Sequence, residues 1–230
     1  MMSRPCLMIF GPQGVGKGTQ AERLALALGI EHLSTGVLLR QAVRDATPLG
    51  RRVSDCLDRG DLVPDELMVG LLQAEIERLH RADTGYVLDG FPRTIDQAVA
   101  FAALVDAPIA AAIELTASLD VLLDRLLRRR VCPACDTITT APTHVDAVAC
   151  PNGDGIAIRR SDDTPTAIGH RLALYDLHTE RLVAWFRGAS RVITIDGEEP
   201  PDRVHAQILE ALDDTRVAPV RTLRSLAVGH

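Results

Sequence analysis

Short apolar runs alternate with amphipathic stretches along this chain. The run Cys6–Phe10 lies between a proline and a glycine, and such a compact run is typical of a strand buried on both faces of a sheet. Three later runs have the same character and are predicted as strands, at residues 86–89, 110–115 and 191–195. These four runs therefore predict a buried parallel sheet.

Between these strands, apolar residues recur three and four positions apart, as they do on the buried face of a helix. The spacing predicts helices over residues 19–28, 37–45, 49–59, 65–80, 94–105, 118–130, 165–187 and 202–212. Asp65 is placed to cap the fourth of them, and Thr94 and Gln97 have the spacing of a capping box at the start of the fifth. Strands that alternate with helices predict an α/β fold with a parallel sheet, right-handed crossovers and helices on both faces.

The pattern breaks between residues 131 and 163, where cysteine, proline, glycine and threonine occur in turn-like arrangements. We interpret this stretch as a loop-rich subdomain inserted into the main domain. No apolar run reaches the roughly 20 residues that cross a bilayer, and the N-terminus has no signal-peptide pattern. We therefore expect a cytoplasmic protein without a membrane partner.

Composition narrows the possible partners. Of the 230 residues, 47% are hydrophobic and only 3% are aromatic, so aliphatic side chains must form the core. The net charge of −6 argues against binding to nucleic acids through overall electrostatic attraction. All but one of the 25 basic residues are arginines, and the single lysine, Lys17, lies in a glycine-rich loop.

That loop, residues 10–19, follows the first predicted strand and precedes the first predicted helix. Its glycines let main-chain N–H groups turn towards an anion, and the helix N-terminus adds the positive end of its dipole. Lys17 adds a mobile positive charge for terminal phosphates. The usual motif has serine or threonine directly after the lysine, whereas Gly18 precedes Thr19 here. The loop therefore predicts a nucleotide-phosphate site of a variant kind.

Residues 11–20 resemble the phosphate loop of adenylate kinases, and three further segments match that family in the same order. They are residues 34–40 (Ser-Thr-Gly-Val-Leu-Leu-Arg), 88–94 (Leu-Asp-Gly-Phe-Pro-Arg-Thr), and 160–163 (Arg-Ser-Asp-Asp) followed by Arg171. The resemblance covers residues 6–212. It implies the P-loop nucleoside monophosphate kinase fold, a central parallel sheet with helices on both faces plus a small inserted lid.

In this family a core carries two mobile pieces, and the resemblance implies the same division here. The kinase domain would span residues 1–214, with a core made of residues 1–33, 64–127 and 164–214. The monophosphate-binding section, called the AMP section below, would be residues 34–63, and the lid residues 128–163. Residues 215–230 would form a C-terminal tail.

The resemblance implies reversible phosphoryl transfer from MgATP to AMP, which gives two molecules of ADP. Such a transfer needs in-line positioning and neutralisation of charge on the phosphate oxygens. Arginine provides both, because it is always ionised and binds oxygens in pairs. Asp89, at the end of a predicted strand, would hold the magnesium ion through its waters. The catalytic residues implied are Lys17, Asp89, Arg93, Arg129, Arg160 and Arg171.

Two substrate sites follow from the same resemblance. ATP would contact Gly14, Val15, Gly16, Lys17, Gly18, Thr19, Arg125, Arg129, Ile138, Thr139 and Glu199. AMP would contact Thr35, Arg40, Asp61, Leu62, Val63, Gly90, Phe91, Pro92, Arg93, Gln97, Arg160 and Arg171. The amide of Gln97 can both donate and accept hydrogen bonds, as the edge of adenine requires.

Three of the five cysteines cluster in the predicted lid. Cys132 and Cys135 are separated by two residues and Cys150 follows, a spacing with which thiolates can hold a tetrahedral zinc ion. The resemblance implies a structural zinc site here, because many relatives carry one in the lid. Their fourth ligand usually falls one residue before Asp154, so we predict Asp154 as the fourth ligand, with His144 as the alternative.

Four positions depart from the family pattern: Val37, Asp61, Thr139 and Glu199. They leave the phosphate-binding residues intact, but they point to lower turnover, altered base preference or weaker magnesium dependence. Two alternatives therefore stay open, a kinase for UMP or CMP and a nucleotide-binding regulatory relative with little activity. A GTPase switch is excluded, because its guanine-binding motif would need a second lysine. We expect a monomer.

Overall fold

The structure is a computed structural model that describes residues 6–104, 108–153, 155–189, 192–213 and 221–222. At its centre, parallel strands run in the order β2-β3-β1-β4-β9. They are β1 (Cys6–Phe10), β2 (Glu31–Ser34), β3 (Tyr86–Asp89), β4 (Pro108–Thr116) and β9 (Val192–Asp196). A further strand, β10 (Arg221–Thr222), pairs antiparallel with the start of β4. The parallel sheet expected from the sequence is confirmed.

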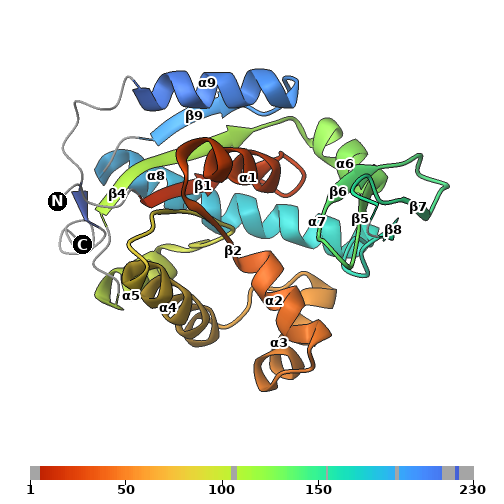
Figure 1. The fold of residues 1–230 in the computed structure, drawn as a ribbon, viewed down its shortest axis with the longest axis horizontal. Coiled ribbons are helices and arrows are strands. Elements are labelled where there is room, and N and C mark those ends of the chain that lie inside the picture. Colours follow the sequence, from red (N-terminus) through yellow and green to blue (C-terminus); the bar gives the residue numbers. More distant parts are fainter. Residues whose placement is uncertain (1–5, 105–107, 154, 190–191, 214–220, 223–230) are drawn as a thin grey trace.

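Helices cover both faces of this sheet (Figure 1). One face carries α1 (Lys17–Leu28), α6 (Leu119–Arg128), α7 (Pro165–Leu174) and α9 (Pro201–Asp213). The other carries α4 (Asp65–Arg81), α5 (Ile95–Leu104) and α8 (Glu180–Ala189). Successive residues of β1 point to opposite faces, so Ile9 belongs to the first apolar core and Met8 to the second. No helix within the described ranges is long and apolar enough to cross a membrane.

Two smaller parts flank the edge of the sheet where the site lies. The short helices α2 (Thr35–Arg44) and α3 (Pro48–Arg59) form one of them. The other is an antiparallel sheet in the order β6-β5-β8-β7, at the right of Figure 1. Its strands are β5 (Arg129–Val131), β6 (Ile138–Thr140), β7 (Ala147–Ala149) and β8 (Ile156–Ile158). The sequence predicted loops here and continued the preceding helix to residue 130, whereas α6 (Leu119–Arg128) ends two residues earlier and β5 begins, because three-residue strands are too short to show a period.

The sequence also missed β2, in which Leu33 is the one buried residue. Its polar neighbours break the apolar run, and the strand exists because it pairs with β3. The helix predicted over residues 165–187 is interrupted by a π turn, η1 (Tyr175–Thr179). This turn places the hydroxyl of Thr179 where it donates a hydrogen bond of 3.1 Å to the main-chain oxygen of Arg93. Such turns are frequent at functional sites.

Two predicted caps differ from the structure. Asp65 is the first residue of α4 rather than its cap, and its carboxylate accepts a hydrogen bond of 2.7 Å from the amide of Gln97. Thr94 does accept the N–H of Gln97 at 3.1 Å. The side chain of Gln97, however, reaches the N–H of Arg93 at 2.8 Å instead of that of Thr94. The N–H of the residue before Thr94 thus replaces half of the predicted capping box, while the nitrogen of the Gln97 amide makes the tertiary contact with Asp65.

Candidate active site

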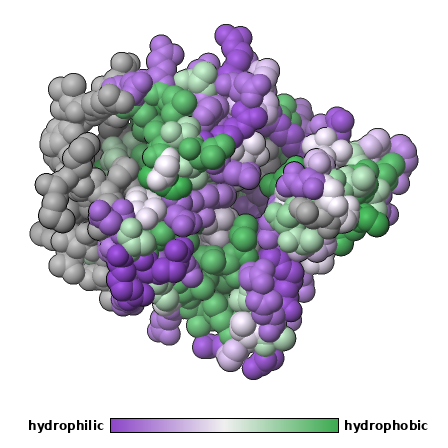
Figure 2. Space-filling view, in the orientation of Figure 1, coloured by the Kyte–Doolittle hydropathy of each residue, from purple (hydrophilic) through white to green (hydrophobic). Residues whose placement is uncertain are grey.

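The carboxyl ends of β1 and β3 open into the main cavity of the molecule. In open α/β sheets ligands bind at such ends, where the strand order changes direction around a central strand. The cavity has a volume of about 1000 Å³ and is lined by the loops after both strands, the α2–α3 region and the lid. Figure 2 shows a hollow with hydrophilic residues around it between the lid and the α2–α3 region.

The phosphate loop wraps around the side chain of Lys17. Gly16 adopts a φ of +106°, a conformation that glycine takes without strain. The ammonium group of Lys17 donates hydrogen bonds to the main-chain oxygens of Gly11, at 2.7 Å, and Pro12, at 2.9 Å. Burial lowers the pKa of Lys17 to about 8, although the nearby carboxylate of Asp89 opposes this shift. At neutral pH the group is charged and can move from these carbonyls to phosphate oxygens.

Asp89 ends β3 with its carboxylate near the phosphate loop. Its Oδ2 atom lies 3.4 Å from Nε2 of His32 and accepts a hydrogen bond of 3.3 Å from the hydroxyl of Ser34. Burial by itself raises the pKa of Asp89, but the hydrogen bond with His32 and the charge of Lys17 hold that pKa below its usual value. The carboxylate is therefore ionised at neutral pH, as binding to a hydrated magnesium ion requires.

Arginines from distant segments meet at the same cavity. Arg129 donates two hydrogen bonds to Asp163, of 2.8 Å from Nε and 2.5 Å from Nη2. Arg160 grips Asp162 in the same two-pronged way, at 2.8 and 2.6 Å, and Arg171 donates a further bond of 2.8 Å to Asp162. The charges of Arg160, Arg171 and Arg40 hold the pKa of Asp162 at about 2 despite its burial. The carboxylates thus preorganise the guanidinium groups at the cavity wall.

Positive charge exceeds negative charge in this cavity. Burial lowers the pKa of Arg40 to about 10, and the positive charge of Arg160 lowers it further. Burial and the neighbouring Arg171 likewise lower the pKa of Arg93. Nε of Arg40 and Nη1 of Arg171 are buried without a hydrogen-bond partner in the described part of the chain. Buried donors without partners cost free energy, so the cavity favours a polyanionic ligand.

A smaller cavity opens beside the arginines. It is lined by Thr35, Leu39, Leu57, Asp61, Leu62, Val63, Met68, Gly90, Phe91, Arg93 and Gln97. Gln97 is fixed from both sides, by the N–H of Arg93 on its oxygen and by the carboxylate of Asp65 on its nitrogen. One amide hydrogen and one lone pair then remain for a base, as far as the described residues show. Thr35 is buried and donates its hydroxyl to the main-chain oxygen of Asp89 at 3.1 Å.

The other residues predicted for AMP lie where the two cavities meet. Those that line both cavities are Asp61, Leu62, Gly90, Phe91 and Arg93, whereas Arg40, Pro92, Arg160 and Arg171 line only the main one. The carboxylate of Asp61 accepts a hydrogen bond of 2.7 Å from Arg59 and lies 3.5 Å from Nδ1 of His170. Asp61 thus connects the segment after α3 to α7.

Four further residues were predicted for ATP: Arg125, Ile138, Thr139 and Glu199. All of these except Thr139 line the main cavity. Its neighbours Ile138 and Thr140 do line the cavity. Thr139 points away from it, because successive side chains of a strand point to opposite faces. Arg125 donates hydrogen bonds of 2.7 Å to the main-chain oxygen of Gly197 and 3.2 Å to that of the next residue.

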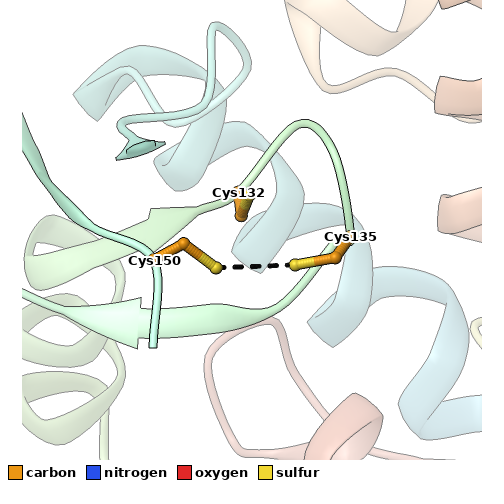
Figure 3. A group of neighbouring side chains, drawn as sticks. All are labelled: Cys132, Cys135 and Cys150. Atoms are coloured by element: carbon orange, nitrogen blue, oxygen red, sulfur yellow. Dashed lines mark hydrogen bonds between the residues drawn. The ribbon is translucent and has the colours of Figure 1, made fainter. Parts of the chain in front are cut away.

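The three lid cysteines turn their thiols towards one another (Figure 3). The Sγ atoms of Cys132, Cys135 and Cys150 lie within 4.8 Å of one another, and those of Cys135 and Cys150 are 3.5 Å apart. Soft thiolates in this arrangement fit a zinc ion. His144 does not belong to the group in the described part of the chain. Asp154 lies outside the described residues.

Several residues that hold the site together were not predicted. His32 and Ser34 lie on β2 and reach Asp89 on the neighbouring strand, so missing the strand meant missing them. Asp162 and Asp163 stand next to a predicted arginine in the motif at residues 160–163. That adjacency was the signal for them, because a buried arginine needs a carboxylate.

Comparison with known proteins identifies the family. A family model described as adenylate kinase matches residues 9–191. An adenylate kinase of Cyanothece sp. is 40% identical over 215 residues, which cover 91% of this chain and 96% of that protein. Adenylate kinases of Gloeobacter violaceus and Citrifermentans bemidjiense are 38% and 39% identical over 90% of this chain and 97% and 98% of their own length. With the phosphate loop and the arginines around one cavity, these matches show that the chain belongs to the adenylate kinase family.

Proposed function

We propose that this adenylate kinase transfers the terminal phosphoryl group of MgATP to AMP, in a reversible reaction that yields two molecules of ADP. One observation carries the proposal: the phosphate loop with Lys17 and the arginines of the AMP side open onto the same cavity. A donor and an acceptor phosphate bound there would meet between them. That is the in-line arrangement on which phosphoryl transfer depends.

Each charged group has a role in this proposal. The main-chain N–H groups of residues 14–19 and the ammonium of Lys17 would hold the terminal phosphates of ATP. Arg40 and Arg93 would hold the phosphate of AMP. The charge that spreads over the migrating group would be neutralised by Arg129, Arg160 and Arg171. Closure of the lid would exclude water, which otherwise accepts the phosphoryl group.

The bases would bind at the two ends of the cavities. Gln97, Thr35 and the main chain at residues 62–63 would recognise the adenine of AMP. Gln97 is suited to this because the N–H of Arg93 and the carboxylate of Asp65 fix the direction of its amide. The adenine of ATP would lie near Arg125, Ile138, Thr139 and Glu199.

Asp89 fits a hydrated magnesium ion. Its carboxylate is ionised, and a Cβ added to Gly18 of the phosphate loop would lie 3.6 Å from its Oδ2. When bound with ATP, magnesium supplies neutralisation of charge on the phosphates. Asp89 would orient the waters of the ion, and His32 and Ser34 would hold the carboxylate in that position.

We infer a structural zinc ion in the lid, and the cluster of three cysteines supports it. The buried apolar cluster of this small sheet is Cys132, Cys150 and Ala157, which is too small to hold the sheet together on its own. We therefore expect the purified protein to contain about one equivalent of zinc by metal analysis. Cys132→Ser should abolish the zinc and lower the midpoint of thermal unfolding by about 5–10 °C.

The control for this prediction is Cys56→Ser, which changes a half-buried cysteine outside the cluster. It should leave the zinc content unchanged. Protein that contains less than about a tenth of an equivalent of zinc after growth with added zinc would contradict the site.

A panel of nucleoside monophosphates with MgATP tests the function. We expect kcat/KM for AMP to exceed that for UMP, CMP and GMP by at least about tenfold. Gln97→Leu should raise KM for AMP about tenfold and leave KM for ATP unchanged, because in this proposal AMP is the substrate whose base reaches the amide. If UMP or CMP is phosphorylated and AMP is not, the protein is a UMP or CMP kinase and the proposal is wrong. Nucleotide binding without any turnover would identify a regulatory relative.

Three further predictions stay open to measurement. ATP and AMP as partners follow from the family, whereas a monomeric state is to be tested by size-exclusion chromatography with light scattering. A cytoplasmic location is to be tested by cell fractionation. The division into a core, the AMP section and the lid is to be tested by hydrogen exchange with and without bound nucleotides.

A further inference from the structure

We propose that Arg44 and Asp136 form a latch that stabilises the closed arrangement of the AMP section and the lid. The inference rests on the proposed function, because it concerns how the two nucleotide sites are held together. It makes Arg44 and Asp136 positioning residues, which act through the parts they join and touch no reacting atom.

The contact is geometrically strong for a pair at the surface. Nη1 of Arg44 donates to Oδ1 of Asp136 at 3.1 Å, and Nη2 donates to Oδ2 at 3.0 Å. Each nitrogen thus meets its own oxygen, the two-pronged arrangement that gives arginine–carboxylate pairs both strength and direction. The side chains are 33% and 24% exposed, so water screens the pair only in part.

The pair joins segments that are 92 residues apart in the chain. Arg44 is the last residue of α2, and it lies one helical turn after Arg40, which lines the main cavity. Asp136 lies in the lid and lines that cavity too. In the described part of the chain, no other ion pair connects residues 34–63 with residues 128–163. The latch is therefore the ion pair in direct contact between the two parts, and Arg40 adds a longer-range attraction to Asp136 and Asp162.

The position of Asp136 depends on the cysteine turn. It directly follows Cys135, and its N–H donates a hydrogen bond of 2.9 Å to the main-chain oxygen of Cys132. Its φ is +55°, a left-handed conformation that few residues other than glycine, asparagine and aspartate adopt readily. Any ion bound by these cysteines would thus also fix the carboxylate that Arg44 grips. Asp136 thus connects the cysteine turn to the end of α2.

The latch has a defined consequence for the reaction. The lid and the AMP section cannot separate without breaking both hydrogen bonds, so the pair favours the closed state in which both nucleotides are held. Its loss should weaken binding of a ligand that needs both sites. It should not slow the chemical step, because the phosphate-binding groups remain.

The test is a double-mutant cycle with Arg44→Gln and Asp136→Asn, since asparagine tolerates the left-handed conformation. The ligand is a bisubstrate analogue in which five phosphates join two adenosines, and Kd is measured by calorimetry. We expect each single variant to raise Kd about two- to fivefold, and the double variant to raise it no more than one single variant does. kcat for ADP formation should be unchanged or higher, because opening becomes easier.

Two controls separate the latch from other effects. Glu75→Gln breaks an exposed ion pair with Arg78 within α4 and should not change Kd. Asp136→Gly removes the carboxylate and keeps the left-handed backbone conformation, so it should raise Kd as Asp136→Asn does. Additive effects in the cycle, an unchanged Kd in either single variant, or a fall in kcat at unchanged Kd would each overturn the proposal. A wild-type protein without turnover would instead refute the proposed function, and the cycle could still be measured.

Discussion

Replacing Lys17 by methionine is expected to lower kcat for ADP formation about a thousandfold. The ammonium of Lys17 is the one mobile cation in the phosphate loop, where it now rests on the main-chain oxygens of Gly11 and Pro12. Methionine has a similar length but no charge, so the charge on the transferred phosphate would lose a stabilising partner. A coupled assay of ADP formation with saturating MgATP and AMP measures the effect.

The control for this variant must show that the AMP side survives. Binding of AMP measured by calorimetry should stay within about threefold of the wild type, because no residue of the smaller cavity has changed. Lys17→Arg should also be strongly impaired, since a planar guanidinium does not fit the carbonyl cradle that a compact ammonium occupies. Retention of kcat within about tenfold in Lys17→Met would contradict the role.

Arg129→Met is expected to have an effect of similar size, a fall in kcat of about a thousandfold. Arg129 begins β5 in the lid and projects its guanidinium into the main cavity, held there by Asp163. Without it, the charge that spreads over the migrating phosphoryl group loses a partner that the lid brings in. Steady-state kinetics should show the loss mainly in kcat, with a smaller change in KM for AMP.

The neighbouring arginine supplies a matched control. Arg128 faces Asp124 one turn away on α6, at 3.5 Å, and does not line the cavity. Arg128→Met should therefore leave kcat within about twofold of the wild type. Arg129→Lys should recover part of the activity, because it restores the charge but not the two-pronged grip on Asp163. Equal effects of Arg128→Met and Arg129→Met would contradict the role.

The phosphate loop shows what could be predicted from sequence. Its glycines, its lysine and the helix after it are contiguous, so the phosphate-binding groups of the loop can be recognised within one short stretch of sequence. The first buried strand was predicted for a similar reason, because its apolar run is short, continuous and bounded by a proline and a glycine. The arginines were assigned through resemblance, and the structure places every predicted phosphate-binding arginine at the main cavity.

Other features exist only because distant segments meet. β2 carries too few apolar residues to be seen alone, yet it brings His32 and Ser34 to Asp89. The carboxylate of Asp65 accepts a hydrogen bond from the amide of Gln97 instead of capping the main-chain N–H groups at the start of α4. The π turn of η1 and the lid strands likewise depend on packing between segments, which local sequence propensity does not predict.

The sequence by itself determined the alternation of the four long buried strands with helices, the phosphate loop and the groups predicted to bind phosphate. Tertiary structure alone decided which carboxylate holds which guanidinium, how Gln97 is oriented, and that Arg44 meets Asp136. The physical reason is the range of the interactions. Periodicity, caps and turns act over a few neighbouring residues, whereas pairing of buried charges depends on distances that only the folded chain defines.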